Sequence, residues 1–189
     1  MVAFVFLAPS FEVAVAQEPA VDVRIAEAIS PLPESLRDGA TVIEYDANWS
    51  PEVLRQGSNG MTCSHDRPRP NDPPFGVRCV AASVMPQQLM LAKLLGSGMT
   101  HTQASAEVRA AKASGKLQTP TVGAMTYLRT GKSAKASTVV WKMLLPGAKA
   151  EDLGLPTKPS NGSPYMTSSG TPQAALVMPQ TEASLAISR

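Results

Sequence analysis

The sequence has few of the features that identify an activity. Only 17% of its 189 residues are charged and 5% are aromatic, and it contains two cysteines and two histidines. The formal net charge of +2 is too small, and the Lys and Arg residues are too scattered, to form the basic surface that a phosphate backbone requires. No apolar run approaches the ~20 residues of a membrane-spanning helix. We therefore expect neither a nucleic-acid partner nor a membrane span.

The local motifs of common enzyme classes are also missing. The sequence contains neither the G-x-S-x-G nor the S-x-x-K pattern of serine hydrolases. Residues 131–133 (Gly-Lys-Ser) resemble the end of a phosphate-binding loop, but Thr126 stands where the earlier glycine is required. Asp66 and Asp72 flank a proline-rich stretch without the spacing of a calcium loop, so we interpret them as turn residues. No motif therefore assigns a catalytic residue.

The N-terminus has the pattern of a secretory signal. Residues 1–8 are almost wholly apolar, Pro9 ends this run, and Ala-Val-Ala at 14–16 supplies the small residues that a signal peptidase needs. No Lys or Arg precedes the run and Glu12 lies before the cleavage site, so a buried N-terminal strand is the alternative. A start codon placed too far downstream would explain the missing basic residues. We expect residues 1–16 to be the signal peptide of a bacterial protein that is periplasmic or secreted.

The two cysteines agree with export. Cys63 and Cys79 lie in a proline-rich region, and in an oxidising compartment such a pair most simply closes a disulfide. A loop of this size would stabilise the fold by ~3 kcal/mol. A zinc site formed by Cys63, His65, Cys79 and His101 has the right number of ligands, but the spacings match no common pattern and the disulfide would consume the thiols. We predict the Cys63–Cys79 disulfide, no metal and no other cofactor.

The apolar patterns predict an α+β fold: a small antiparallel sheet, two to three short helices, one disulfide and many loops. Helical spacing predicts helices over 21–29, from Pro86 to Gly96, and from Thr100 or Thr102 to Gly115. Strand composition and apolar runs predict strands at 41–45, 53–55, 61–63, 77–80, 122–128, 139–145 and 174–178.

Turn signals set the expected connections. Asn59-Gly60 predicts a hairpin between the second and third strands, because both residues tolerate a positive φ. Residues 158–171 have the composition of a loop. No linker of domain size divides the chain. We therefore expect one globular domain over 17–180 and a disordered tail over 181–189.

Several segments resemble a group of small exported bacterial proteins to which no activity is assigned. These segments are 54–63 (LRQGSNGMTC), Cys79, 127–131 (YLRTG) and 172–179 (PQAALVMP). In that group an aromatic residue is expected in place of Met61 and a Pro-His pair near the last strand. This chain has Pro-Gln at 172–173, so no role for that histidine transfers. The resemblance covers most of the chain from about Leu36 and implies export and a disulfide-containing domain, but no function.

The function expected from these observations is binding. We predict a non-enzymatic exported protein that binds a protein partner or a small ligand through its loops, with Trp49 and His65 as candidate ligand contacts. The alternative is a periplasmic hydrolase-like enzyme with a dispersed site that uses His65 or His101 as its base. A metal-trafficking protein would require reduced cysteines or clustered methionines, and the nine methionines are spread along the chain.

Overall fold

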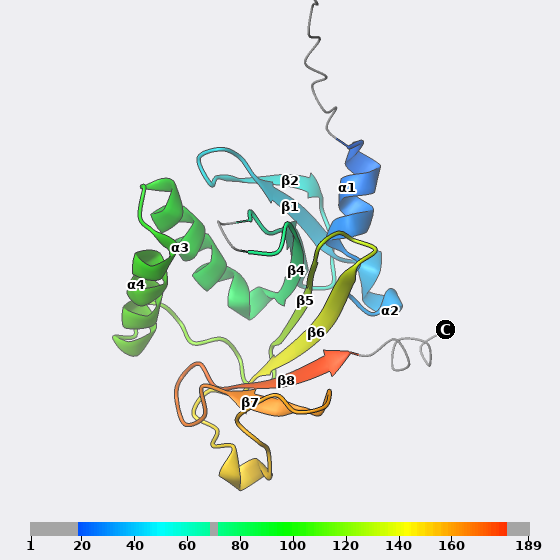
Figure 1. Ribbon diagram of the computed structural model, residues 1–189. Helices are drawn as coiled ribbons and strands as arrows, with labels where there is room; N and C mark the ends of the chain where they lie inside the picture. Colours follow the sequence, from blue (N-terminus) through cyan, green and yellow to red (C-terminus); the bar gives the residue numbers. More distant parts are fainter. Residues whose placement is uncertain (1–18, 69–71, 181–189) are drawn as a thin grey trace, which may run out of the picture.

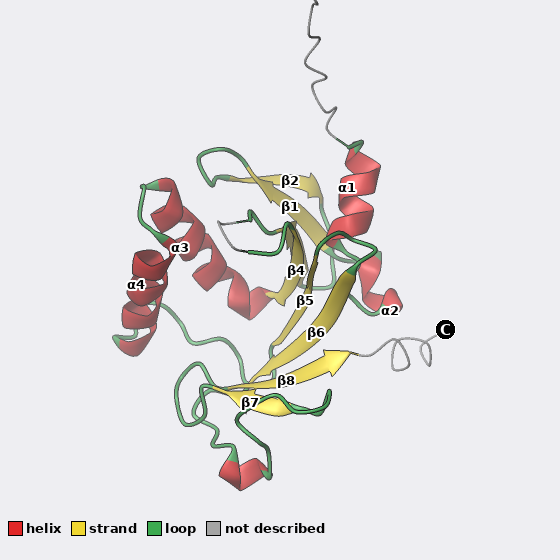
Figure 2. Ribbon diagram, in the orientation of Figure 1, coloured by secondary structure: helices red, strands yellow, loops and turns green. Residues whose placement is uncertain are grey.

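The computed structural model describes residues 19–68 and 72–180, which form one eight-stranded sheet with helices on both faces (Figures 1 and 2). The predicted signal peptide and C-terminal tail lie outside the described residues. The strand order is β2-β1-β3-β4-β5-β6-β8-β7, and all neighbours are antiparallel except β1 and β3, which are parallel. The predicted α+β fold with a disulfide is therefore confirmed, but the sheet is large and mixed rather than small and antiparallel.

The described strands and helices agree with most of the predicted ranges. The strands are β1 (Thr41–Tyr45), β2 (Pro51–Arg55), β3 (Met61–His65), β4 (Phe75–Ala81), β5 (Met125–Gly131), β6 (Ser137–Leu144), β7 (Tyr165–Thr167) and β8 (Ala175–Gln180). The helices are α1 (Val21–Ala28), α2 (Glu34–Arg37), α3 (Met85–Gly96) and α4 (His101–Ala113), with 3-10 turns η1 (Ala82–Val84) and η2 (Glu151–Leu153). The sequence analysis missed α2, and it missed β7 inside the expected loop at 158–171. None of these helices is long and apolar enough to cross a membrane.

The predicted hairpin at Asn59-Gly60 is wrong, because β2 does not pair with β3. Strand β2 pairs with β1, and residues 56–60 pass the start of β1 so that β3 pairs on its other side. Gly57 lies so close to this strand that a Cβ atom would be 2.3 Å from the carbonyl carbon of Ala40. The Asn59 amide donates to the carbonyl oxygen of Leu36 at 2.7 Å, and Gly60 adopts a φ of 76°. The Asn-Gly pair therefore forms a crossover anchored on α2.

The two faces of the sheet differ in character. Paired residues across β3, β4 and β5 form one row of Cys63, Cys79 and Tyr127, and this row packs against Ala28 and Leu32 beside α1. The next row, with side chains on the opposite face, is Ser64, Arg78 and Leu128. Side chains alternate between faces along a strand, so the apolar core and the polar row lie back to back.

Helix α3 covers the polar face of the sheet, and α4 packs against α3 (Figure 1). Helix α3 has Pro86 in its first turn, where the missing N–H costs no hydrogen bond. Helix α4 begins with a capping box in which the Thr100 side chain accepts from the Gln103 N–H and the Gln103 side chain accepts from the Thr100 N–H. At the end of α3, a Cβ on Gly96 would lie 2.4 Å from the carbonyl oxygen of Asn48. The end of α3 therefore packs directly on the β1–β2 loop.

Candidate functional site

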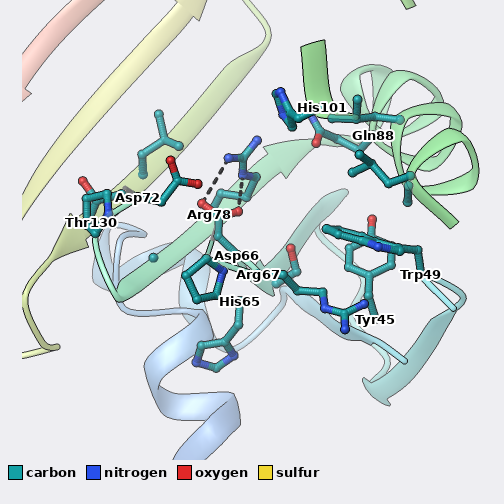
Figure 3. A pocket seen from close by; sticks show the side chains of 18 of the residues that line it. Tyr45, Trp49, His65, Asp66, Arg67, Asp72, Arg78, Gln88, His101 and Thr130 are labelled. Atoms are coloured by element: carbon teal, nitrogen blue, oxygen red, sulfur yellow. Dashed lines mark hydrogen bonds and ion pairs between the residues drawn. The ribbon is translucent and has the colours of Figure 1, made fainter. Parts of the chain in front are cut away.

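A cavity of about 460 Å³ lies between the polar face of the sheet and α3 (Figure 3). Strands β3, β4 and β5 contribute residues to its walls, as do the β1–β2 loop and the described ends of the β3–β4 loop. The remaining walls come from α3 and from the first residue of α4. Aromatic, charged and aliphatic side chains all line the cavity, among them Tyr45, Trp49, Asp66, Arg67, Asp72, Arg78, Leu91, Leu95, His101, Leu128 and Thr130. Ligand cavities in proteins have this size and this mixture of apolar walls with a few polar groups.

The floor of the cavity carries an ion pair between Arg78 of β4 and Asp66, the residue that follows β3. Nε of Arg78 donates to Oδ1 of Asp66 at 2.6 Å, and Nη2 donates to Oδ2 at 3.0 Å. This two-point contact fixes the plane of the guanidinium. The Arg78 and Asp66 side chains remain 32% and 27% exposed, so both are accessible from the cavity. Within the described residues Nη1 of Arg78 makes no hydrogen bond, which leaves that edge of the guanidinium available to a ligand.

One wall of the cavity is aromatic and is held rigidly. Trp49 has a φ of 64°, and Oδ1 of Asp46 accepts hydrogen bonds from the backbone N–H groups of Asn48 and Ser50 on either side of it. Its ring lies 6.0 Å from the ring of Tyr45, and the Arg67 guanidinium stacks 4.7 Å from its centroid. Arg67 also donates to the carbonyl oxygen of Asp46 at 2.8 Å. A bulky residue with positive φ is an outlier that costs free energy, and such strain persists where surrounding contacts impose it.

Three leucines and one histidine also line the cavity. Leu91 and Leu95 come from α3, Leu128 of β5 lies next to Arg78, and His101 stands at the start of α4 (Figure 3). Nδ1 of His101 lies 3.2 Å from Oγ of Ser105, one helical turn further along α4. Ser105 does not belong to the cavity-lining residues of the described chain.

The structure separates the two predicted ligand contacts. Trp49 lines the cavity, as expected of a ligand contact, although binding itself stays a prediction. His65 also belongs to the lining residues, but its imidazole is directed toward α1, where Nε2 is 3.5 Å from Oε2 of Glu27. The imidazole of His65 therefore does not face that of His101 across the cavity.

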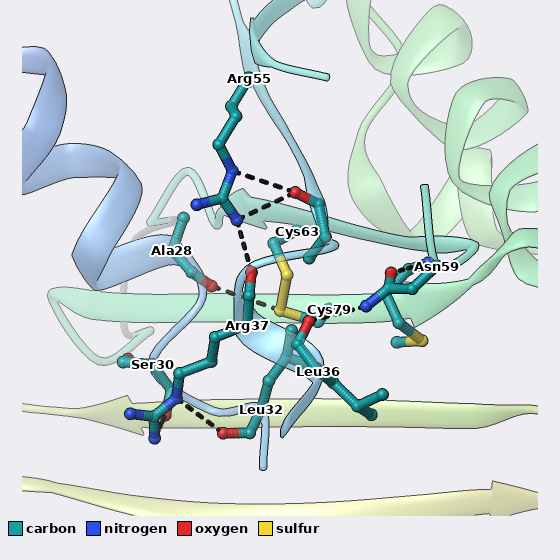
Figure 4. Close-up of a disulfide and its surroundings, with 11 residues drawn as sticks. Ala28, Ser30, Leu32, Leu36, Arg37, Arg55, Asn59, Cys63 and Cys79 are labelled. Carbon is teal, nitrogen blue, oxygen red and sulfur yellow. Dashed lines mark hydrogen bonds between the residues drawn. A yellow bond between two sulfur atoms is a disulfide. The ribbon is translucent and has the colours of Figure 1, made fainter. Parts of the chain in front are cut away.

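Cys63 and Cys79 form a disulfide behind the cavity floor (Figure 4). Both cysteines are completely buried, and Sγ of Cys79 lies 3.3 Å from the carbonyl oxygen of Ala28. The oxidised cysteines cannot supply thiolate ligands to the zinc set considered from the sequence. Over residues 19–68 and 72–180, no group of three or more His, Cys, Asp or Glu side chains is placed to hold a metal ion.

The electrostatic environment of the polar face follows from burial and from Arg78. Burial raises the pKa of the Tyr45 phenol, with Arg78 lowering it and Asp66 raising it to smaller extents. Burial also lowers the pKa of the Lys142 ammonium on β6, and the positive charge of Arg78 lowers it further. Lys142 and Arg78 therefore place two cationic groups within electrostatic reach of each other on this face.

Sequence reasoning missed the central residues of the site. Arg78 stands between Val77 and Cys79 in a strand, so strict alternation places it on the face opposite the disulfide. This alternation is the sequence signal that could have identified Arg78 as a site residue, because a charged residue in the middle of a sheet needs a partner or a cavity. Asp66 was interpreted as a turn residue, and only the strand pairing shows that it faces Arg78.

Comparison with protein-family models, with curated proteins and with solved structures finds no match to this chain. The function must therefore be argued from the cavity itself.

Proposed function

We propose that this protein is a non-enzymatic, exported binding protein that holds a small ligand in the cavity between α3 and the sheet. The observation that carries the proposal is the combination of a rigid aromatic wall at Trp49 with one oriented ion pair, Asp66–Arg78, on the floor. Apolar walls supply affinity, and a small number of fixed polar groups supplies specificity. A buried disulfide and the apolar N-terminal segment support export.

Binding is the better supported function because the histidines are not arranged for catalysis in this cavity. A hydrolase that uses His101 is favoured by one contact, the 3.2 Å separation from the Ser105 hydroxyl. A nucleophile has to reach the substrate, however, and Ser105 lies outside the described lining of the cavity. If the protein hydrolyses p-nitrophenyl acetate, and both His101→Ala and Ser105→Ala abolish this activity, the protein is a hydrolase and the binding proposal is refuted.

The binding proposal is tested with N-phenyl-1-naphthylamine, a neutral fluorescent probe of apolar cavities. A Trp141→Phe background leaves Trp49 as the single tryptophan, so energy transfer from Trp49 to the probe reports occupancy of the cavity. We expect saturable binding of one probe molecule per chain. Absence of saturable binding, or binding without quenching of Trp49, would contradict the proposal.

A blocking variant localises the probe. Thr130 lines the cavity at the end of β5, so Thr130→Trp should fill it and prevent binding. Thr167→Trp is the matched control, because Thr167 lies in β7 at the far edge of the same sheet. For this pair the emission of the probe itself is measured, since each variant adds a tryptophan. Equal binding by both variants would place the probe elsewhere and refute the assignment.

A further inference from the structure

We infer that the ligand is a small carboxylate with a flat apolar body, and that Arg78 binds its carboxylate group. The inference rests on the proposed binding function and names the chemical class that the cavity selects. Its basis is the unpaired edge of the Arg78 guanidinium in a cavity that aromatic and leucine side chains also line (Figure 3).

Asp66 orients Arg78 for this role. Because Asp66 takes Nε and one hydrogen of Nη2, the guanidinium presents Nη1 together with the second hydrogen of Nη2. These two parallel N–H groups match the two oxygens of a carboxylate. The guanidinium is already immobilised by its partner, so binding a ligand orders little additional side chain.

The exposed edge of Arg78 disfavours a cationic group beside it, and Asp72, the second carboxylate of the described lining, makes an interaction of its own. An ammonium group binds most favourably to the face of an aromatic ring or to a carboxylate that has no other partner. The Arg67 guanidinium already stacks on the Trp49 ring at 4.7 Å, and both oxygens of Asp66 already accept hydrogen bonds from Arg78. An anion at the exposed edge of Arg78 would be attracted by the positive charge of the guanidinium.

The walls define the rest of the ligand. Trp49 and Tyr45 present aromatic surface to the cavity, and Leu91, Leu95 and Leu128 present aliphatic surface. A flat ring system placed against these side chains buries apolar area. The volume of about 460 Å³ accommodates a bicyclic ring with its carboxylate on the floor.

The test is a series of ligands that share one ring and differ in charge. We would measure displacement of N-phenyl-1-naphthylamine by 2-naphthoate, 2-naphthamide and 2-naphthylmethylammonium, with acetate as the charged group without a ring. We expect 2-naphthoate to bind about tenfold more tightly than the amide, the ammonium ion to bind most weakly, and acetate not to compete. Equal displacement by the three naphthyl compounds would leave the binding function intact and refute the carboxylate class. Failure of the probe itself to bind would refute both.

Variants assign the contact to Arg78. Arg78→Lys keeps the positive charge but loses the two-point geometry, so it should remove about tenfold of the affinity for 2-naphthoate and leave the amide unaffected. Arg129→Lys is the matched control, because Arg129 lies on β5 and its side chain contacts Ser137 and Ala134. An undiminished preference for the carboxylate in Arg78→Lys would overturn the inference. The ligand series on the unaltered protein decides the question if this variant does not fold.

Discussion

Replacing Cys63 and Cys79 together with alanine should lower the free energy of unfolding by about 3 kcal/mol. The two residues are 16 apart in the sequence, and closing a loop of that length removes this much conformational entropy from the unfolded chain. The serine double variant should lose more. Both positions are completely buried, and an unsatisfied buried hydroxyl costs a further ~1–3 kcal/mol.

Urea unfolding followed by circular dichroism measures this loss. For a chain of this length 3 kcal/mol corresponds to a fall of about 6–12 °C in the melting temperature. Wild-type protein treated with a phosphine reductant is the control, and it should lose a similar amount, whereas the alanine double variant should not respond to the reductant. A loss below about 1 kcal/mol in the alanine variant would refute the reasoning, because the cross-link would then not constrain the unfolded chain.

Three further changes test the fold and the polar face. Gly57→Ala should cost more than about 2 kcal/mol in urea unfolding, because its Cβ would collide with the backbone at Ala40; a neutral result would contradict the tight crossover. Thr100→Ala should cost about 1 kcal/mol through loss of the α4 cap, and Thr100→Ser should restore it. Lys142→Met should be more stable than the wild type at pH 7, because burial lowers the pKa of Lys142 and disfavours its charged form. The advantage should shrink as the pH rises toward the unfolded pKa of about 10.4, where wild-type Lys142 is neutral in both states; an advantage that grows with pH would refute this sign.

Local patterns predicted the elements well, because helical spacing and strand composition are properties of short segments. The helix at 21–29 and the strand at 41–45 correspond to α1 and β1. The pairing of strands cannot be predicted in this way, because it depends on the path that each connection takes in space. The Asn59-Gly60 pair has the chemistry of a tight turn, but the close approach of Gly57 to the start of β1 carries the chain past that strand instead.

The cavity was harder to predict than the fold. Its lining residues run from Tyr45 to Thr130, and they meet only because β1, β3, β4 and β5 are neighbours and α3 folds back over them. No fixed spacing in the sequence encodes that arrangement. Trp49 could be selected from its loop context alone, whereas Arg78 becomes visible only when its strand is known to have the disulfide on its other face.

The disulfide lies directly behind the floor of the cavity. Cys79 is next to Arg78 in β4, and Cys63 is two positions after the start of β3, so the cross-link joins two of the strands that form the cavity floor. Thermodynamic linkage is reciprocal: if oxidation tightens ligand binding, the ligand makes the disulfide harder to reduce by the same free energy. A tenfold preference for the oxidised form corresponds to a shift of about 30 mV in reduction potential.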